Sequence, residues 1–259
     1  MNLIQAIILG IIQGLSEFLP ISSSGHLMLF HEILGIEAQD NMTFIIVLNM
    51  GSLLPLLFVF RKDVAALIKK PFQKTTALLA IATVPLVIAT LIFEGFIEST
   101  FISIEFLPFG FVITGAALLL SDKIRKNKKE FEKIGFLDAI FVGLVQALAV
   151  IPGISRSGAT ITASMSRGIN REAAAKFSFL MSIPAALGAM IFRTSRIIAN
   201  PALLDGIIIS NLVAGFIAAA ITGYFAINFM LNLVKKARLK YFALYYIFAV
   251  VVIIFVFLI

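Results

Sequence analysis

Long apolar stretches alternate with short polar ones along almost the whole chain. Six apolar runs approach the roughly 20 residues that a helix needs to cross a bilayer. They cover residues 43–60, 75–93, 104–120, 175–192, 207–232 and 241–259. The pattern predicts an all-α integral membrane protein with six transmembrane helices.

Two further apolar stretches, 3–34 and 134–166, are interrupted near their middle. A proline followed by serine and glycine residues breaks the first at 20–26 and the second at 152–158. Each stretch therefore predicts a helix, a loop and a second helix. Irregular backbone is tolerated at membrane depth only where it is buried in protein or lines a cavity. We expect both stretches to form re-entrant helix-loop-helix hairpins rather than spans.

The two interrupted stretches resemble each other when they are aligned without gaps so that Gly10 matches Gly143. We refer to this shift along the chain as the repeat offset. The matching positions are Gly10, Gln13, Leu15, Ser22, Ser24 and Gly25 in the first, and Gly143, Gln146, Leu148, Ser155, Ser157 and Gly158 in the second. Three apolar runs follow each stretch, so the pattern predicts a duplication whose second copy is inverted in the membrane. We expect one membrane domain over 1–259, with repeat one at 1–121, a basic cytoplasmic loop at 122–133 and repeat two at 134–259.

The positions of the basic residues agree with this topology. Of the 21 Lys and Arg residues, 18 lie in segments that it places on one side, which are 61–74, 122–133, 167–176 and 233–240. Such a bias is typical of the cytoplasmic side of a membrane protein. The net charge of +7 is therefore explained by loops that contact membrane lipids, and we expect no nucleic-acid partner. The tips of the two hairpins should then meet near the midplane.

The amino-acid composition limits which side chains can take part in a reaction. Apolar residues make up 60% of the chain and charged residues 14%, whereas soluble domains carry about 25% charged residues. The absence of cysteine excludes disulfides, thiol catalysis and cysteine-based metal sites. Any reactive group must therefore come from oxygen- and nitrogen-bearing side chains.

Polar side chains would gather where the hairpin tips meet. They are Gln13, Glu17, Ser22, Ser23, Ser24 and His26 from the first break, and Ser155, Arg156, Ser157 and Thr160 from the second. An ionisable residue at membrane depth costs about 2.5–3.5 kcal/mol and is a functional-site hypothesis by default. The guanidinium of Arg156 suits phosphate oxygens. Helices that restart after Gly25 and Gly158 would aim free N–H groups at the same anion.

The residue types suggest individual roles. Ser23 or Ser24 is a candidate nucleophile, and His26 is the candidate proton-transfer group because histidine titrates near neutrality. Glu17 follows Gln13 by four residues on the same helix face. That pair could hold Mg²⁺ or Ca²⁺ through hard oxygen ligands, with a diphosphate supplying others.

Plainer interpretations stand beside these roles. Arg156 could be a structural charge that pairs with Glu17. Gly10 and Gly14 form a pair of small residues at helical spacing, which is more typical of helix packing than of ligand binding.

Two runs carry a resemblance to a known family. Residues 13–26, Gln-Gly-Leu-Ser-Glu-Phe-Leu-Pro-Ile-Ser-Ser-Ser-Gly-His, resemble the first signature of the undecaprenyl-diphosphate phosphatases, the bacitracin-resistance family. Residues 152–160, Pro-Gly-Ile-Ser-Arg-Ser-Gly-Ala-Thr, resemble the second signature. The resemblance covers essentially the whole chain. One departure is the run Asn-Met-Gly at 49–51, where the family has Gln-Leu-Gly.

The resemblance implies an enzyme that hydrolyses undecaprenyl diphosphate to undecaprenyl phosphate and inorganic phosphate, which recycles the lipid carrier of cell-wall polymers. It implies a multi-pass protein of the cell membrane whose site faces the extracytoplasmic side. The implied catalytic residues are Glu17, Ser23, His26 and Arg156. The expected substrate-binding residues are Ser22, Ser24, Gly25, Ser155, Ser157, Gly158 and Thr160, and the expected metal ligands are Glu17 and Gln13.

The rival interpretation is a transporter or flippase of polyprenyl phosphate, because inverted repeats with broken helices are typical of transporters. A carrier needs an anion site but no proton-transfer group beside a serine. The sequence leaves open whether Ser23 attacks or orients an attacking water. It also leaves open the metal, the prenyl chain length and the oligomeric state, for which a homodimer is one candidate.

Overall fold

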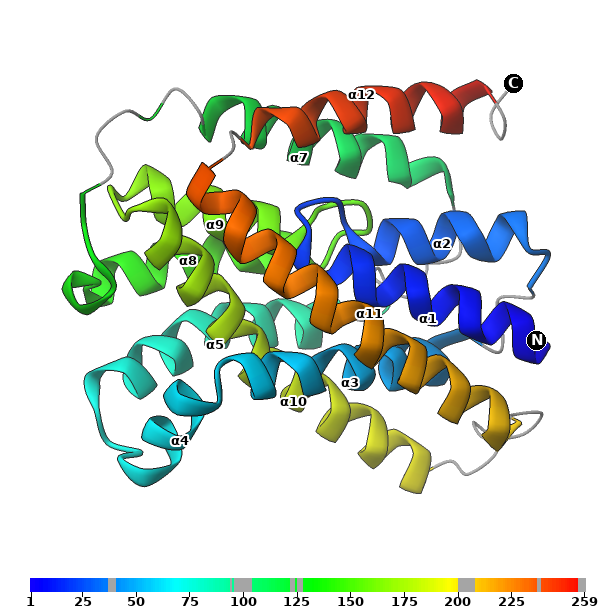
Figure 1. Ribbon diagram of the computed structural model, residues 1–259, viewed down its shortest axis with the longest axis horizontal. Helices are drawn as coiled ribbons and strands as arrows, with labels where there is room; N and C mark the ends of the chain where they lie inside the picture. The colour runs from blue at the N-terminus through cyan, green and yellow to red at the C-terminus, as the bar shows by residue number, and fades with distance from the viewer. Residues whose placement is uncertain are drawn as a thin grey trace.

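The computed structural model is built of helices (Figure 1). It describes residues 1–36, 41–93, 95, 104–121, 124, 128–199, 208–236 and 239–255. The helices are α1 (Leu3–Phe18), α2 (Ser23–Ile33), α3 (Asn41–Val59), α4 (Arg61–Lys69), α5 (Lys74–Ile92), α7 (Leu107–Ser121), α8 (Phe136–Leu148), α9 (Arg156–Ser166), α10 (Arg171–Ala199), α11 (Ile209–Lys236) and α12 (Lys240–Ile253), with short 3₁₀ turns at Ile104–Phe106 and Phe131–Lys133. Among the described residues no strand forms, and extended pairing is limited to a bridge between Lys129 and Ile169. The predicted all-α class is confirmed for this part of the chain.

Several helices are suited to crossing a membrane. Four of the described helices are long and apolar enough, namely Lys74–Ile92, Ile104–Ser121, Arg171–Ala199 and Ile209–Lys235. A fifth candidate is the pair α3 and α4, which bends by 86° at the junction. Helix α12 is apolar but only 14 residues long. The chain is thus a multi-pass membrane protein, whereas the count of six spans stays a prediction.

Two elements differ from the predicted boundaries. Helix α10 spans Arg171–Ala199 although the apolar run covers only 175–192, because hydropathy marks the apolar part of a helix and not its polar ends. The expected loop 61–74 contains α4, whose Val64 and Leu67 are partly buried against the core. A short amphipathic helix has too few apolar residues to register as a span.

The helices pack in pairs that are remote in sequence, with α1 along α11, α5 along α8 and α7 along α12 (Figure 1). The α1–α11 contact is close. A Cβ added at Gly10 would lie 2.3 Å from the Gly215 carbonyl oxygen, and one at Gly14 would lie 2.1 Å from Thr222 Oγ1. Helix packing as the role of Gly10 and Gly14 is therefore confirmed.

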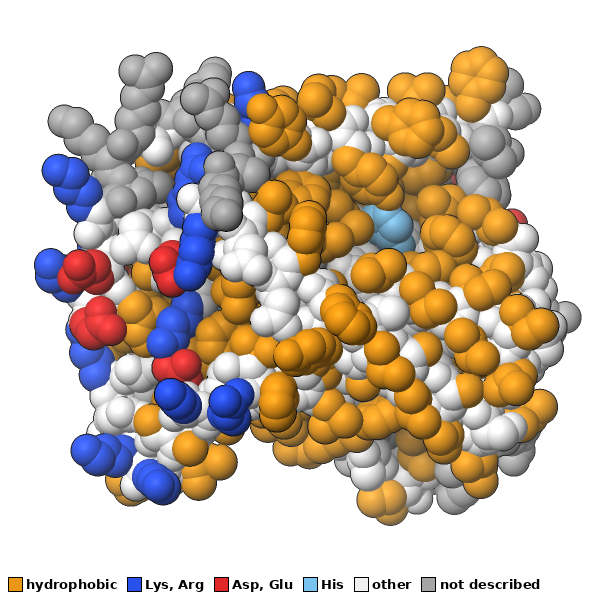
Figure 2. All heavy atoms as spheres, viewed as in Figure 1, with side chains coloured by type: hydrophobic (Ala, Val, Ile, Leu, Met, Phe, Trp, Pro, Cys, Tyr) orange, Lys and Arg blue, Asp and Glu red, His pale blue; other side chains and the backbone are white. Residues whose placement is uncertain are grey.

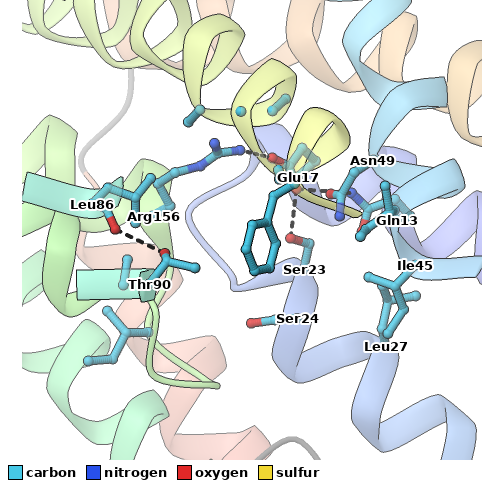
Figure 3. Close-up of a pocket in the computed structure, with 18 of the residues that line it drawn as sticks. Gln13, Glu17, Ser23, Ser24, Leu27, Ile45, Asn49, Leu86, Thr90 and Arg156 are labelled. Carbon is cyan, nitrogen blue, oxygen red and sulfur yellow. Dashed lines mark hydrogen bonds and ion pairs between the residues drawn. The ribbon is translucent and has the colours of Figure 1, made fainter. Parts of the chain in front are cut away.

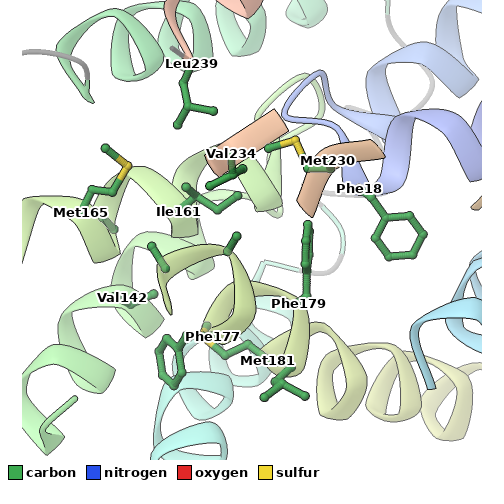
Figure 4. Packing of buried hydrophobic residues seen from close by; sticks show 14 of the residues in the cluster. Phe18, Val142, Ile161, Met165, Phe177, Phe179, Met181, Met230, Val234 and Leu239 are labelled. Carbon is green, nitrogen blue, oxygen red and sulfur yellow. The ribbon is translucent and has the colours of Figure 1, made fainter. Parts of the chain in front are cut away.

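The main apolar cluster holds the inner end of α1 in place (Figure 4). Phe18, the last residue of α1, is buried and meets Phe179 of α10 edge to face, with ring centroids 5.7 Å apart. Phe179 in turn contacts Phe60 at 6.4 Å. Because Glu17 directly precedes Phe18, this aromatic contact also fixes where the Glu17 side chain begins.

Charged side chains gather at one end of the molecule, and apolar side chains cover most of the remaining face (Figure 2). At this end Asp138, buried in the first turn of α8, accepts hydrogen bonds from Lys129 Nζ at 2.9 Å and Arg167 Nε at 3.0 Å. Burial opposes ionisation of Asp138, but the bonds from Lys129, the Gly135 N–H and Arg167 outweigh it and hold the pKa of this carboxyl below its ordinary value. Part of the predicted basic loop 122–133 lies outside the described residues.

Replacing Asp138 by asparagine is expected to lower the free energy of unfolding by about 1–3 kcal/mol, because it removes charge-assisted hydrogen bonds from a buried group. The pKa of Asp138 is depressed in the folded protein, so its stabilisation is present above the unfolded pKa of about 3.9 and is lost as pH falls through the folded pKa. Thermal unfolding in detergent, followed from about pH 7 to about pH 3, measures the difference in stability between wild type and the asparagine variant. This difference should shrink as the pH falls.

The matched control is Glu130→Gln, because Glu130 forms an exposed pair with Lys133 at 3.5 Å. Exposed ion pairs contribute about 0–1 kcal/mol to the free energy of unfolding. An equal loss in both variants, or a difference that does not depend on pH, would contradict the assignment of Asp138.

Candidate active site

The first break lies between α1 and α2, where Pro20 cannot donate a helical hydrogen bond. Ser22 caps α2, since its Oγ accepts the N–H of Gly25 at 3.3 Å. Its backbone φ is 67°, in the left-handed region that residues other than glycine rarely adopt. Ser23 follows as the first residue of α2.

The second break, between α8 and α9, is built in a similar way. Ser155 Oγ accepts the N–H of Gly158 at 3.1 Å and caps α9, which begins at Arg156. Gly153 has a φ of 87°, and a Cβ added there would lie 2.8 Å from the Leu107 carbonyl oxygen. Glycine is required at this position both by the backbone conformation and by the close approach of α7.

The two breaks lie beside each other in the middle of the molecule (Figure 1). Ser157 Oγ donates to the Leu19 carbonyl oxygen at 3.1 Å. Arg156 Nη2 donates to Glu17 Oε1 in an ion pair. The structure therefore brings together the two polar breaks that the sequence predicted would meet.

Glu17 is the point where the two breaks converge (Figure 3). While its Oε1 accepts from Arg156, its Oε2 accepts from Ser23 Oγ at 2.7 Å and from Gln13 Nε2 at 3.0 Å. The Glu17 side chain is 10% exposed and that of Arg156 is 26% exposed. The ion pair that the sequence offered as the plainer role of Arg156 is present, and it lies where a ligand can reach it.

A cavity of about 420 Å³ lies beside this ion pair. Its polar lining consists of Gln13, Ser16, Glu17, Ser23, Ser24, Asn49, Thr90, Ser155, Arg156, Ser157 and Arg196. Its larger apolar side chains are Leu27, Ile45, Ile46, Leu86, Val87, Leu91, Ile154 and Phe192. Ligand sites commonly combine apolar walls with a few convergent polar groups. This combination suits an amphipathic ligand with a charged head and a hydrocarbon chain.

The polar end of the cavity suits an anion. Helices α2 and α9 both begin there, because Ser23, Ser24, Arg156 and Ser157 all line the cavity. The N–H groups in the first turn of a helix lack intrahelical partners, and the helix dipole favours negative charge near them. Arg156 adds a cation with planar donors, which is the chemistry that recognises phosphate.

Some predicted site residues lie elsewhere. Ser22, Gly25 and Gly158 form the helix caps and do not line the cavity. Thr160 Oγ1 lies within hydrogen-bond distance of Ser178 Oγ, at 2.6 Å, and is not part of the lining either.

His26 is also absent from the cavity lining, although it is one turn along from Ser23. One ring nitrogen, Nδ1, bonds to the Ser22 carbonyl oxygen, and the other, Nε2, bonds to the Tyr245 hydroxyl of α12. The structure therefore does not place His26 beside the Ser23 hydroxyl.

Sequence reasoning missed five residues around the site, which are Ser16, Asn49, Thr90 and Arg196 of the polar cavity lining and Tyr245 beside His26. Asn49 of α3 lines the cavity, and its Oδ1 accepts from Gln13 Nε2 at 2.7 Å. The signal was an amide side chain within an apolar run, at a position that departs from the family pattern. Tyr245, the partner of His26, carries no comparable local signal, because a tyrosine in an apolar helix is ordinary in a membrane protein.

The oxygen-bearing residues fit a divalent cation that also takes ligands from its substrate. Among the described residues no group of three or more His, Asp and Glu side chains gathers, so the protein alone offers no full cage. Gln13 Oε1 is buried and has no hydrogen-bond partner within the described part of the chain. The Gln13 amide nitrogen, Nε2, donates to Glu17 Oε2 and to Asn49 Oδ1, so the oxygen-bearing ends of these three side chains lie close together. Mg²⁺ commonly binds one or two carboxylates and completes its shell with phosphate and water.

Comparisons with known proteins identify the family of this chain. The family model for "Bacitracin resistance protein BacA" matches residues 6–252. The undecaprenyl-diphosphatase of Carboxydothermus hydrogenoformans is 46% identical over 245 residues, which cover 95% of this chain and 94% of that protein. The undecaprenyl-diphosphatases of Halothermothrix orenii and Alkaliphilus metalliredigens are 41% and 36% identical, and each comparison covers 95% of this chain with 94% and 95% of the relative. The chain therefore belongs to the bacitracin resistance protein BacA family.

Proposed function

We propose that this protein is an undecaprenyl-diphosphate phosphatase, which releases the terminal phosphate of undecaprenyl diphosphate and leaves undecaprenyl phosphate. The observation that carries the proposal is the convergence of Ser23 and Arg156 on the carboxylate of Glu17. A hydroxyl, a carboxylate and a guanidinium then share one cavity whose remaining walls are largely apolar. The names of the relatives, which cover nearly the whole chain, support the same activity.

In the proposed reaction the diphosphate lies at the polar end of the cavity, and the prenyl chain leaves along the apolar walls. Arg156 and the first-turn N–H groups of α2 and α9 bind the terminal phosphate. Ser23 Oγ attacks its phosphorus, the bond to the bridging oxygen breaks, and undecaprenyl phosphate departs. Glu17 Oε2, 2.7 Å from Ser23 Oγ, takes the serine proton. Positioning and charge stabilisation supply most of the rate in phosphoryl transfer.

The second half of the reaction restores the serine. Water attacks the phosphoserine, the bond between phosphorus and Ser23 Oγ breaks, and the proton held by Glu17 returns to Ser23. Both hydrogens of the water leave with the inorganic phosphate. Glu17 thus performs the proton transfer that the sequence assigned to His26, because Glu17 is the group that contacts the Ser23 hydroxyl.

Glu17, Gln13 and Asn49 are the residues that would hold Mg²⁺ or Ca²⁺. When bound, the cation would neutralise charge on the diphosphate oxygens. Both breaks of the site come from one chain, so this proposal requires no second copy.

We propose the inverted-topology repeat as the framework of the site, with α1–α2 and α8–α9 as re-entrant hairpins and six spans. Three pairs of helices support it, because the first residues of α1 and α8, of α2 and α9, and of α7 and α12 are separated by the same offset that relates the two breaks. The packing of α1 on α11 and of α8 on α5 joins the two halves in a reciprocal way. The basic end would be cytoplasmic, and the cavity would open to the extracytoplasmic side of the cell membrane.

The direct test is release of inorganic phosphate from undecaprenyl diphosphate by the purified protein in detergent. We expect undecaprenyl phosphate as the second product. We also expect a chelator to suppress release and added Mg²⁺ or Ca²⁺ to restore it. Undiminished phosphate release after exhaustive chelation would contradict a role for the divalent cation, without affecting the phosphatase assignment.

The same protein in liposomes tests the flippase interpretation. Movement of polyprenyl phosphate between leaflets, with no phosphate release from the diphosphate under any metal condition, would reject the enzyme and favour the carrier. Phosphate release in detergent, where no second leaflet exists, would favour the enzyme.

A further inference from the structure

The imidazole of His26 is held at both nitrogens. Its Nδ1 lies 2.7 Å from the Ser22 carbonyl oxygen, and its Nε2 bonds to the Tyr245 hydroxyl. A carbonyl oxygen can only accept, so Nδ1 carries the proton. In the neutral ring Nε2 then accepts, and the Tyr245 O–H donates to it. The two rings also stack, with centroids 5.7 Å apart and an interplanar angle of 16°.

This hydrogen-bonded ring supports an unusual turn. Among the described residues, Ser22 is the one residue other than glycine with a positive φ. Such a conformation persists only where surrounding contacts hold it. The Ser22 carbonyl oxygen accepts both the His26 backbone N–H, at 3.1 Å, and His26 Nδ1–H. The next residue is Ser23, whose direction toward Glu17 depends on this turn.

The second break differs from the first in the backbone conformation of its capping serine and in lacking the histidine. At the offset that relates the two breaks, Ser155 corresponds to Ser22 and Ala159 corresponds to His26. Ser155 has an ordinary φ of −71°, and its N–H donates to Thr114 Oγ1 of α7 at 3.0 Å. The left-handed serine therefore occurs in the copy that has the histidine.

Each break is also braced by a helix from the opposite half of the chain. Thr114 of α7 binds the second break directly. Tyr245 of α12 binds the first break through His26, and the starts of α7 and α12 are related by the same offset as the two breaks. The two helices are thus equivalent in position, but Thr114 and Tyr245 are not matched residues at that offset. One acts on a backbone N–H and the other through an imidazole.

We propose that Tyr245 is a positioning residue for the reaction, acting through His26 to hold the Ser22 turn and so to direct the Ser23 hydroxyl at Glu17. The inference rests on the proposed phosphatase function. In this role His26 is part of the support of the nucleophile, and neither its ring nor Tyr245 contacts the reacting phosphate.

The test begins with Tyr245→Phe, which removes the hydroxyl but retains the stacked ring. We expect kcat for phosphate release to fall about two- to tenfold, as for loss of one neutral hydrogen bond, with KM unchanged. The control is Tyr241→Phe. Tyr241 lies one turn earlier on α12 and is 60% exposed, so a general effect of tyrosine at the lipid surface would appear in both variants.

A spectroscopic measurement follows the His26 ring itself. The chain has two histidines, so a His31→Gln background leaves the ring-nitrogen NMR signals of His26 alone. We expect Nδ1 to be protonated both with Tyr245 and in Tyr245→Phe. In Tyr245→Phe the Nε2 signal should shift toward that of a ring nitrogen whose lone pair accepts no hydrogen bond. Unchanged nitrogen shifts, or a kcat within twofold of wild type, would overturn the proposal.

A second pair of variants separates support from proton transfer. The amide of His26→Asn can still donate to the Ser22 carbonyl oxygen but cannot transfer protons near neutrality, and His26→Leu can do neither. We expect the asparagine variant to retain about three- to tenfold more activity than the leucine variant. Equal inactivity would assign proton transfer to His26 and overturn its supporting role. If wild type released no phosphate, the phosphatase function would fail, yet the NMR measurement would still decide whether Tyr245 fixes the ring.

Discussion

Replacing Arg156 by alanine is expected to lower kcat/KM for phosphate release by about 10³-fold, roughly 4 kcal/mol of transition-state stabilisation. The guanidinium is the cation that bonds to Glu17 at the polar end of the cavity. Its loss removes the planar donors for the phosphate and leaves the Glu17 carboxylate, only 10% exposed, without its ion-pair partner. Steady-state kinetics on undecaprenyl diphosphate measure the effect on kcat and KM separately.

A double variant separates the catalytic loss from the structural one. Removing one partner of a buried ion pair is strongly destabilising, whereas removing both is often tolerated. Glu17→Gln combined with Arg156→Ala should therefore recover much of the melting temperature lost in Arg156→Ala, but no activity. Arg156→Lys keeps the charge without the planar fork, and we expect it to fall between wild type and alanine. Full activity in a thermally stable Arg156→Ala protein would reject the phosphate-binding role.

Replacing Ser23 by alanine is expected to lower kcat at least about 10³-fold, because it removes the proposed nucleophile. Ser24→Ala is the matched control. Both serines lie in the first turn of α2 and line the cavity, but Ser23 Oγ donates to Glu17 whereas Ser24 Oγ lies 3.3 Å from Ser22 Oγ. We expect Ser24→Ala to lose less than about tenfold, the scale of one neutral hydrogen bond.

The intermediate gives an independent measurement of the Ser23 role. Rapid acid quenching of the enzyme with phosphate-labelled substrate should yield a phosphoserine that maps to Ser23 and is absent from Ser23→Ala. Oxygen label that passes from water into phosphate in the first turnover, with no trapped phosphoenzyme, would show that a water attacks. Equal losses in the Ser23 and Ser24 variants would instead reject a special role for Ser23.

The local features of the site could be predicted because they depend on neighbouring residues. In each interrupted stretch a proline lies in the loop beyond the end of the first helix. Ser22 and Ser155 cap the next helix, and each accepts the N–H of a glycine three residues later. Long apolar runs likewise predicted the helices that could span a membrane, with boundaries that agree within a few residues for α5 and α11. The expectation that the two breaks meet came from the repeat and the charge bias together.

The direction of individual side chains could not be predicted in the same way. His26 is one turn from Ser23, and helical spacing alone favours a shared face. Helix α12, which packs along α7, instead supplies Tyr245, 219 residues away along the chain, as the partner of the ring. For Arg156, the sequence left open a phosphate or Glu17 as partner, and the structure contains the ion pair with Glu17. Asn49 reaches Gln13 because α1 and α3 pack together.

Hydropathy, prolines and helix caps in the chain alone specified the apolar segments that become helices, where two stretches break and which polar groups those breaks carry, but not the amphipathic helix α4. These are short-range effects, since a cap or a break depends on hydrogen bonds within a few residues. Only the assembled bundle decided that Glu17 receives Ser23 and Arg156 together while His26 faces Tyr245. Those contacts join residues far apart in the chain, and they depend on which helices lie side by side and on how each is rotated about its axis.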